Sequence, residues 1–182
     1  MDFKDQLIMR HPDLTKVPDV VLPEGYRLHD YEPELKDRWT EIVVSAFDEP
    51  YDFDDKTARP KWSPERMKFV EVDGVDVATA TCYEHWDYPG EGFLHMVGTA
   101  KEGKGKGAGR IATQAVLTWL RDHGYKTCIL STDDFRLPAL HVYYSLGFRP
   151  VMNREDMPER WKKVYENIGV DADPMEEQCT EI

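Results

Sequence analysis

Hydrophobic side chains recur every three or four residues in four stretches of this chain, a spacing that predicts amphipathic helices. The first stretch covers residues 33–47 and opens with a proline, and the second follows a glycine-rich turn and ends at Gly124, a residue suited to terminate a helix. The third, residues 137–148, carries a proline in its first turn and a glycine near its end. The fourth follows a candidate cap at Asp156 and contains the apolar residues Trp161, Val164, Tyr165 and Ile168.

Runs rich in β-branched and aromatic residues predict strands between these helices. Two such runs flank Asp73 and Gly74, a dipeptide that favours the tight turn of a β-hairpin, and a second hairpin is expected through residues 87–92 into a strand at 93–100. Shorter strand-like segments occupy residues 25–31, 127–132 and 149–153. Hairpins that alternate with three or four helices favour a mixed α/β domain with a largely antiparallel sheet.

The 182 residues are enough for one domain with a buried core. Residues 1–22 mix polar residues with prolines, and we expect them to form an N-terminal extension packed over the domain. The domain itself is expected to span residues 23–151. Residues 152–182 contain the last helix and an acidic tail, and we expect the tail to be disordered.

The formal net charge of −12 repels phosphate backbones and anionic membrane surfaces, so neither nucleic acid nor a membrane is expected as a partner. No apolar run approaches the roughly 20 residues that span a bilayer, and the chain starts with acids where a signal peptide needs an apolar core. The cysteines are odd in number and widely spaced, which is typical of a reduced set without a zinc or redox motif: Cys82, Cys128 and Cys179. We therefore expect a soluble cytoplasmic protein.

One short stretch departs from this acidity. Residues 103–110 read GKGKGAGR and lie between a predicted strand and a predicted helix. The first turn of a helix has unpaired N–H groups and a partial positive charge from the aligned peptide dipoles, and glycines let a phosphate approach the backbone closely. The stretch therefore predicts an anion site, and a flexible basic loop is the alternative interpretation.

Two nucleotide-binding motifs can be compared with this stretch. A P-loop requires a lysine followed by serine or threonine, and residues 103–110 contain neither hydroxyl residue, which excludes that class of nucleotide hydrolase. Residues 107–112 match the looser dinucleotide pattern G-x-G-x-x-G or A, with Asp133 near the place of a ribose-binding acid. Too little chain follows Asp133 for the remaining strand and helix units of that fold. An NAD-dependent oxidoreductase is therefore kept only as the rival hypothesis.

In two blocks the sequence resembles the GNAT family, the acyl-CoA-dependent N-acetyltransferases. Residues 104–109, KGKGAG, fit the family's pyrophosphate motif, with lysine in place of the usual glutamine or arginine. Residues 136–148, RLPALHVYYSLGF, are similar to the family's N-x-x-A-x-x-x-Y-x-x-x-G-F block, with Arg136 in place of asparagine. Both blocks lie in the family's order and at its usual separation, and the resemblance covers most of residues 23–151.

The resemblance implies an α/β fold of the α+β type, the GNAT fold, in which helices flank a mixed, mostly antiparallel central sheet with a splayed fourth strand. It also implies acetyl-CoA as the acyl-donor cosubstrate, with no metal. In the family the backbone of the fourth strand pairs with the pantetheine arm, and here that segment is Val97, Gly98 and Thr99. The pyrophosphate would be held by the glycine-rich turn: Lys104, Gly105, Lys106, Gly107, Ala108, Gly109 and Arg110. Arg136 replaces an asparagine that hydrogen-bonds the coenzyme, and it could reach a phosphate instead.

The same resemblance places Tyr143 at the family's tyrosine position, where a phenol that stays protonated at neutral pH would donate a proton to the leaving thiolate. His95 lies on the fourth strand, where some family members carry a histidine for proton relay, and it is expected to accept the proton of the attacking amine. The alternatives are helix packing for Tyr143 and a hydrogen-bonded strand histidine for His95. Weaker candidates for the base are Glu84, His85 and Glu91.

The resemblance thus implies an acetyl-CoA-dependent N-acetyltransferase in which a primary amine attacks directly in a ternary complex. The acceptor would be a small-molecule or peptide amine, and the acids and aromatics of residues 47–55, FDEPYDFDD, suit a cationic one. The alternative from another class is a non-catalytic acyl-CoA-binding GNAT-like module that acts as a sensor or scaffold. The apolar helix face around Trp161 either packs on the core or forms a homodimer.

Overall fold

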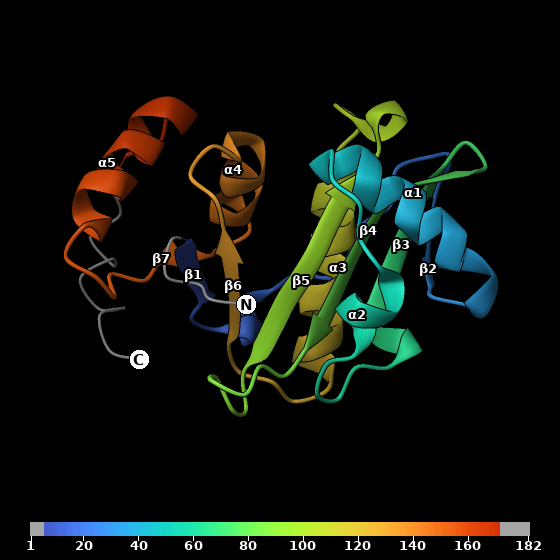
Figure 1. Ribbon diagram of the computed structural model, residues 1–182, viewed down its shortest axis with the longest axis horizontal. Coiled ribbons are helices and arrows are strands. Elements are labelled where there is room, and N and C mark those ends of the chain that lie inside the picture. The colour runs from blue at the N-terminus through green and yellow to red at the C-terminus, as the bar shows by residue number, and fades with distance from the viewer. Residues whose placement is uncertain (1–5, 172–182) are drawn as a thin grey trace. The chain divides into compact units, whose positions relative to one another are not determined.

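The computed structural model describes residues 6–171, which divide into two compact units (Figure 1). The larger unit is residues 14–126, and the smaller unit consists of residues 6–13 and 127–171. Residues 6–13 therefore belong to the same unit as residues 127–171, far away in the sequence. The acidic tail that the sequence predicts to be disordered, residues 172–182, lies outside the described residues.

The larger unit contains an antiparallel sheet of four strands in the order β2-β3-β4-β5. Both hairpins predicted from the sequence are present, and the turn between β3 and β4 has Asp73 and Gly74 with φ of 51° and 83°, the left-handed pair of a tight hairpin. The strands are β2 (Tyr26–Asp30), β3 (Met67–Val72), β4 (Val75–Tyr83) and β5 (Gly92–Thr99).

Helices cover both faces of this four-stranded sheet. Figure 1 shows α1 (Lys36–Phe47) and α2 (Phe53–Thr57) in front of the strands and α3 (Ala108–Asp122) behind them. The face below α1 holds a core of fully buried side chains, including Trp39, Ile42 and Phe69, and each large side chain removed from water contributes about 1.5–3 kcal/mol. Short 3-10 helices connect the elements at Leu14–Lys16, Pro33–Leu35, Pro64–Arg66 and Lys101–Gly103.

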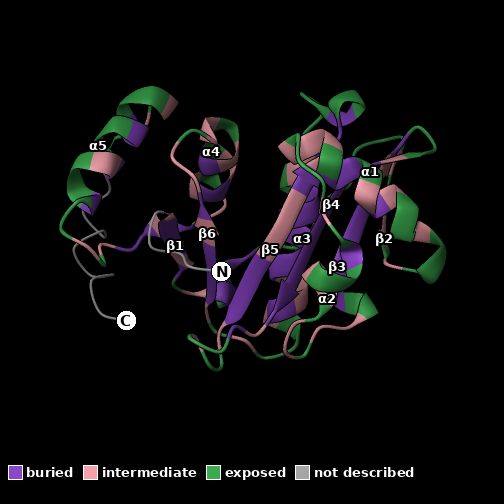
Figure 2. Ribbon diagram, in the orientation of Figure 1, coloured by how far each residue is buried: buried purple, intermediate pink, exposed green. Residues whose placement is uncertain are grey.

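The smaller unit has three antiparallel strands, with β1 between β6 and β7. Strand β1 (Leu7–His11) lies within residues 1–22, which the sequence predicts to be an extension, and it is almost wholly buried, as are most strands in Figure 2. The other elements are β6 (Cys128–Thr132), α4 (Leu137–Ser145), β7 (Arg149–Pro150) and α5 (Met157–Ile168).

The C-terminal helix α5 packs against α4 within the smaller unit. Trp161 is 1% exposed, and its ring lies 6.0 Å from that of Tyr165. Of the two alternatives for this apolar face, packing on the core is the one that the structure shows.

The two cysteines in the described part of the chain, Cys82 and Cys128, are free thiols and buried. Burial raises the pKa of Cys82 to about 12, which makes that thiol unreactive in the folded protein. Within residues 6–171, no helix has the length and apolar composition needed to cross a membrane.

Candidate active site

A turn rich in glycine joins β5 to α3 in the larger unit. Gly105 and Gly107 have φ of 77° and 73°, a left-handed conformation that other residues rarely adopt. A Cβ atom built on either glycine would meet no other atom within 4 Å, so both face open space. The backbone of this turn is therefore exposed to an approaching ligand.

Several N–H groups of this turn lack an acceptor. Among the described residues no hydrogen bond is recorded from the backbone N–H of five turn residues, and helix α3 has no capping side chain. The first helical bond runs from the N–H of Ile111 to the carbonyl oxygen of Gly107 at 3.1 Å. Unpaired amides and the helix dipole together form an anion site. The five residues are Gly105, Gly107, Ala108, Gly109 and Arg110.

Positive side chains surround these amides. Lys104, Lys106 and Arg110 are exposed, and neither lysine makes an ion pair within the described part of the chain. The Tyr26 hydroxyl donates a 2.8 Å hydrogen bond to the carbonyl oxygen of Lys106, which ties the turn to β2. The turn thus combines fixed backbone donors with mobile positive charge, which is suited to a diphosphate.

Two other glycines let the turn pack closely on the sheet. A Cβ on Gly109 would lie 2.5 Å from Thr99 Oγ1, and a Cβ on Gly103 would lie 2.8 Å from Val77 Cβ. Both distances are far below ordinary contact, so a side chain at either position would displace its neighbour. The start of α3 is therefore held against β5.

Strand β5 contains an irregularity just before this turn. Thr81 of β4 pairs with His95 and Thr79 pairs with Gly98, so two residues of β5 oppose one residue of β4. Met96, inside this bulge, has φ of 47°, which is rare for a residue other than glycine. The bulge contains Met96 and Val97, so it interrupts the ladder at the start of the segment Val97, Gly98 and Thr99, which the family resemblance assigns to the pantetheine arm.

His95 is half-buried, and its Nε2 atom is buried with no hydrogen-bond partner among residues 6–171. The Tyr83 ring stands edge-on to the imidazole. Burial lowers the pKa of His95 to about 3, and the positive charges of Arg59 and Lys56 act in the same direction. His95 is therefore neutral at pH 7 and a weak base.

Two of the weaker candidates for the base, Glu84 and His85, have other roles in the fold. Glu84 accepts a 2.7 Å bond from Lys61 Nζ and a 2.6 Å bond from the Tyr125 hydroxyl, and these bonds hold the pKa of Glu84 below its usual value. His85 Nδ1 accepts from the Asp87 N–H at 3.1 Å, and burial lowers the pKa of His85. These contacts tie Glu84 and His85 into the local structure.

Tyr143 and Arg136 belong to the smaller unit. Tyr143 is 7% exposed on α4, and burial raises the pKa of its phenol, opposed by the charge of Arg136. Arg136 Nε donates to Asp133 Oδ2 at 2.9 Å, while Asp133 Oδ1 accepts from Gln6 Nε2 at 3.0 Å. Tyr143 thus remains a proton donor at neutral pH, and Arg136 already has a carboxylate partner.

The residues predicted from the sequence are divided between the two units. The larger unit contains the glycine-rich turn, the segment 97–99 and His95, and the smaller unit contains Tyr143 and Arg136. Sequence reasoning missed Lys56 and Arg59, which lie near His95. The available signal was two cations spaced three residues apart within an otherwise acidic segment.

One group of side chains in the described residues has the composition of a metal site. One ligand atom from each of His29, Glu71 and Asp76 lies within 4.8 Å of the others. His29 Nε2 is already 2.7 Å from Asp76 Oδ1, and Glu71 forms an ion pair with Arg27. These ion pairs account for the cluster.

The chain is similar to several curated proteins. It is 29% identical to a mycothiol acetyltransferase of Rhodococcus erythropolis, over 81% of this chain and 55% of that protein. It is 32% identical to a mycothiol acetyltransferase of Thermomonospora curvata, over 78% of this chain and 50% of that protein. The chain therefore spans about half the length of the curated relatives that it matches.

Solved structures share the fold. A GCN5-related N-acetyltransferase from Sphaerobacter thermophilus matches 80% of this chain and 48% of its own length, with a TM-score of 0.66 and 25% identity. A structure from Salmonella typhimurium with its cofactor acetyl-CoA matches 68% of this chain and 79% of its own length, with a TM-score of 0.55 and 18% identity. The model of the acetyltransferase (GNAT) family matches residues 36–148, which is more than half of the chain. The mixed α/β fold and the glycine-rich turn agree with these matches, and the chain belongs to the GNAT acetyltransferase family.

Proposed function

We propose that this chain is an acetyl-CoA-dependent N-acetyltransferase that transfers the acetyl group directly to a primary amine in a ternary complex. The observation that carries the proposal is the set of unpaired backbone N–H groups of Gly105 and of residues 107–110, at the start of a long helix. Family membership and the name of the curated relatives support an acetyl group as the transferred unit.

The glycine-rich turn fits the coenzyme's diphosphate. Gly105 and Gly107 leave open space above the backbone, and Lys104 and Lys106 supply positive charge beside it. Acetyl-CoA supplies the activated acetyl group when it is bound. Val97, Gly98 and Thr99 would present backbone groups to the pantetheine arm. Arg136, held by Asp133, would be a secondary phosphate contact, and none of these roles needs a metal.

The chemical step needs a proton donor and a proton acceptor. Tyr143 would donate a proton to the departing thiolate, since its raised pKa keeps the phenol protonated at pH 7. His95 would accept the proton of the attacking amine through its unpartnered Nε2. An alkyl amine is mostly protonated at neutral pH, and its deprotonation costs about 4 kcal/mol. The positive charges beside His95 favour the neutral form of a nearby amine, and they also lower the proton affinity of His95 itself.

Two measurements test this proposal. Calorimetric titration with acetyl-CoA should give a dissociation constant in the micromolar range, about −8 kcal/mol, and parallel titration with NAD should give no heat. Thiol release from acetyl-CoA should then depend on an added amine, in a panel that includes the acceptor of the mycothiol acetyltransferases.

The outcomes separate the rival functions. Tight acetyl-CoA binding without amine-dependent thiol release would favour a non-catalytic acyl-CoA-binding module. Binding of NAD instead of acetyl-CoA would favour the oxidoreductase, and heat with neither compound would show that the turn has another ligand.

A further inference from the structure

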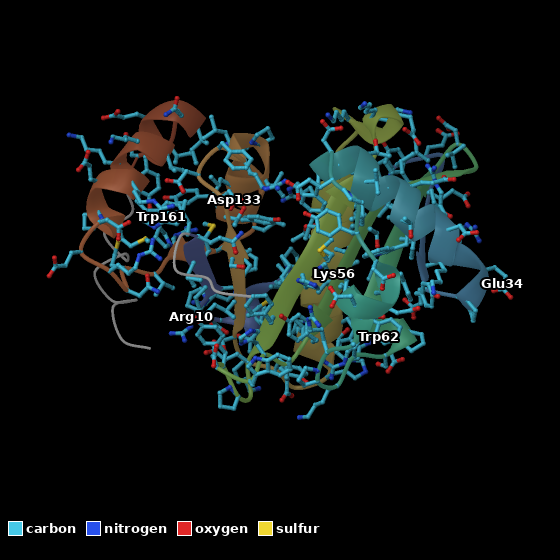
Figure 3. All side chains as sticks on the ribbon, in the orientation of Figure 1. Arg10, Glu34, Lys56, Trp62, Asp133 and Trp161 are labelled. Carbon is cyan, nitrogen blue, oxygen red and sulfur yellow. The ribbon has the colours of Figure 1, made fainter. Side chains whose placement is uncertain are left out.

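Two cations lie close to His95 in the larger unit. Lys56 is on α2 and extends toward β5 (Figure 3), and Arg59 follows two residues after the end of that helix. The charges of Arg59 and Lys56 are the largest electrostatic influences on the imidazole. The surroundings of His95 are therefore positive, although the segment that contains these cations is acidic in sequence.

The guanidinium of Arg59 is fixed without a carboxylate partner. Its Nη1 donates to the backbone carbonyl oxygens of Asp55 at 2.8 Å and Ala58 at 3.0 Å. In the part of the chain that the structure describes, Arg59 makes no ion pair. The side chain is half-buried, and its charge also acts on the buried Tyr83 hydroxyl. Arg59 thus presents a positive charge that backbone carbonyl groups hold in place, with no direct carboxylate contact among the described residues.

The ammonium of Lys56 is withdrawn from solvent. Its side chain is 14% exposed, and Nζ lies 5.6 Å from the centroid of the Tyr51 ring. Its carboxylate partner, Asp55, lies 2.8 Å away, but the Asp55 side chain is 61% exposed. Two cations and one largely solvated carboxylate leave an excess of positive charge at this place.

Two other acids of the segment are engaged elsewhere. Asp52 caps α2 by accepting the N–H of Asp55 at 2.8 Å, and Asp54 pairs with Lys36 at the surface. One of these carboxylates therefore caps the helix, and the other forms an ion pair on the exposed side of the segment. The acidic composition that suggested a cationic acceptor therefore does not describe the charge that faces His95.

We propose that the acceptor carries an anionic group, a carboxylate or a phosphate, close to its reacting amine, and that Arg59 and Lys56 bind this group beside His95. The proposal rests on the proposed function and names its substrate class. Arg59 has guanidinium donors left for charge-assisted bonds to such a group. His95 Nε2, buried and without a partner, supplies an independent polar contact for the amine.

This arrangement also suits the reaction. A bound anion compensates Arg59, which removes part of the positive field that opposes proton uptake by His95. An acceptor with several ammonium groups and no anion would be repelled by the same charges. The binding of the correct acceptor would therefore strengthen the base that acts on it.

The test compares acceptors that differ only in this group. An amino acid is set against its α-amide, and O-phosphoethanolamine against ethanolamine, with thiol release from acetyl-CoA as the readout. The anionic member of at least one pair should have a kcat/KM about 10- to 100-fold higher. The two pairs distinguish a carboxylate from a phosphate.

Arg59→Gln should abolish this preference mainly through KM and leave acetyl-CoA affinity unchanged. The matched control is Lys61→Gln, which removes an exposed cation of the same segment that pairs with Glu84. That variant should keep the full preference. Arg59→Lys keeps the charge but not the two carbonyl contacts. This variant should retain part of the preference for the anionic acceptor that Arg59→Gln loses.

A binding readout does not depend on turnover. In the presence of CoA, an N-acetyl amino acid should bind more tightly than its amide to the wild type, and equally to Arg59→Gln. The inference would be overturned if the wild type showed the same kcat/KM for the charged and uncharged acceptors and the same affinity for the charged and uncharged N-acetyl compounds. Failure to bind acetyl-CoA would instead defeat the proposed function itself.

Discussion

The ring of Tyr83 stands perpendicular to the imidazole of His95, with the centroids 5.2 Å apart and the planes at 89°. Edge-to-face packing of this kind removes one side of the imidazole from water. Since desolvation is the main reason for the low pKa of His95, the Tyr83 ring contributes to the burial that keeps the imidazole neutral.

The stability of the protein should therefore depend on pH through His95. The imidazole is neutral in the folded protein and has a pKa near 6.5 once unfolded, so the unfolded state binds a proton first as the pH falls. The free energy of unfolding should decrease below about pH 6.5, by about 2 kcal/mol at pH 5 from this group alone. In urea unfolding at pH 7.5 and pH 5, His95→Gln should lose that part of the difference. An unchanged difference would contradict the burial of His95.

Tyr143→Phe should slow acetyl transfer without loss of stability. The Tyr143 hydroxyl makes no hydrogen bond that is recorded within residues 6–171, so its removal leaves no buried group unpaired. Loss of a general acid lowers kcat by about 100-fold or more, and acetyl-CoA affinity should stay the same. The matched control is Tyr144→Phe, which removes a hydroxyl that donates to the Asp171 carbonyl. An equal kcat in Tyr143→Phe and Tyr144→Phe would show that Tyr143 is not the general acid.

Gly107→Ala should weaken acetyl-CoA binding by more than 10-fold. Alanine at φ of 73° is strained by about 1 kcal/mol, and relief of that strain would turn the neighbouring amides out of alignment. Gly124→Ala imposes a similar strain at φ of 86°, in open space at the other end of α3. Calorimetry on both variants separates the two effects, because only Gly107→Ala should change the affinity. A similar acetyl-CoA affinity in the two variants would show that the diphosphate does not bind at the glycine-rich turn.

Gly109→Ala should destabilise the fold by about 1–3 kcal/mol, because the new Cβ would collide with Thr99 Oγ1. The double variant Gly109→Ala with Thr99→Ala removes that oxygen and should recover much of the loss. Denaturant unfolding of both single variants and the double variant measures the coupling. Additive losses would show that the two residues do not touch.

The glycine-rich turn could be predicted from the sequence because its signal is local. Alternating glycines and bases directly before an apolar helical pattern specify a turn, a helix start and a positive charge within a few residues. The structure confirms the turn and the helix. The splayed strand, the coenzyme contacts and the proton transfers remain predictions.

Strand β1 and the cations near His95 could not be found in the same way. Residues 7–11 become a strand because β6 and β7, far away in sequence, pair with both of its edges. Lys56 and Arg59 lie in a segment that is rich in acidic residues. The composition of that segment does not indicate which side chains of its short helix face the sheet. The low pKa of His95 likewise depends on burial by residues distant in the chain.

The bulge at Met96 has a consequence for how this protein can change over generations. Because β5 gains one residue there, His95 and Gly98 share a face of the sheet although an odd interval separates them, and Thr99 is left facing α3. Deleting Met96 or Val97 would leave one residue opposite Ala80, so the ladder would become regular with His95 and Gly98 still on one face. Lineages of this chain should therefore be able to lose the bulge by a single deletion at Met96 or Val97 without a change in the faces that Gly98 and Thr99 occupy.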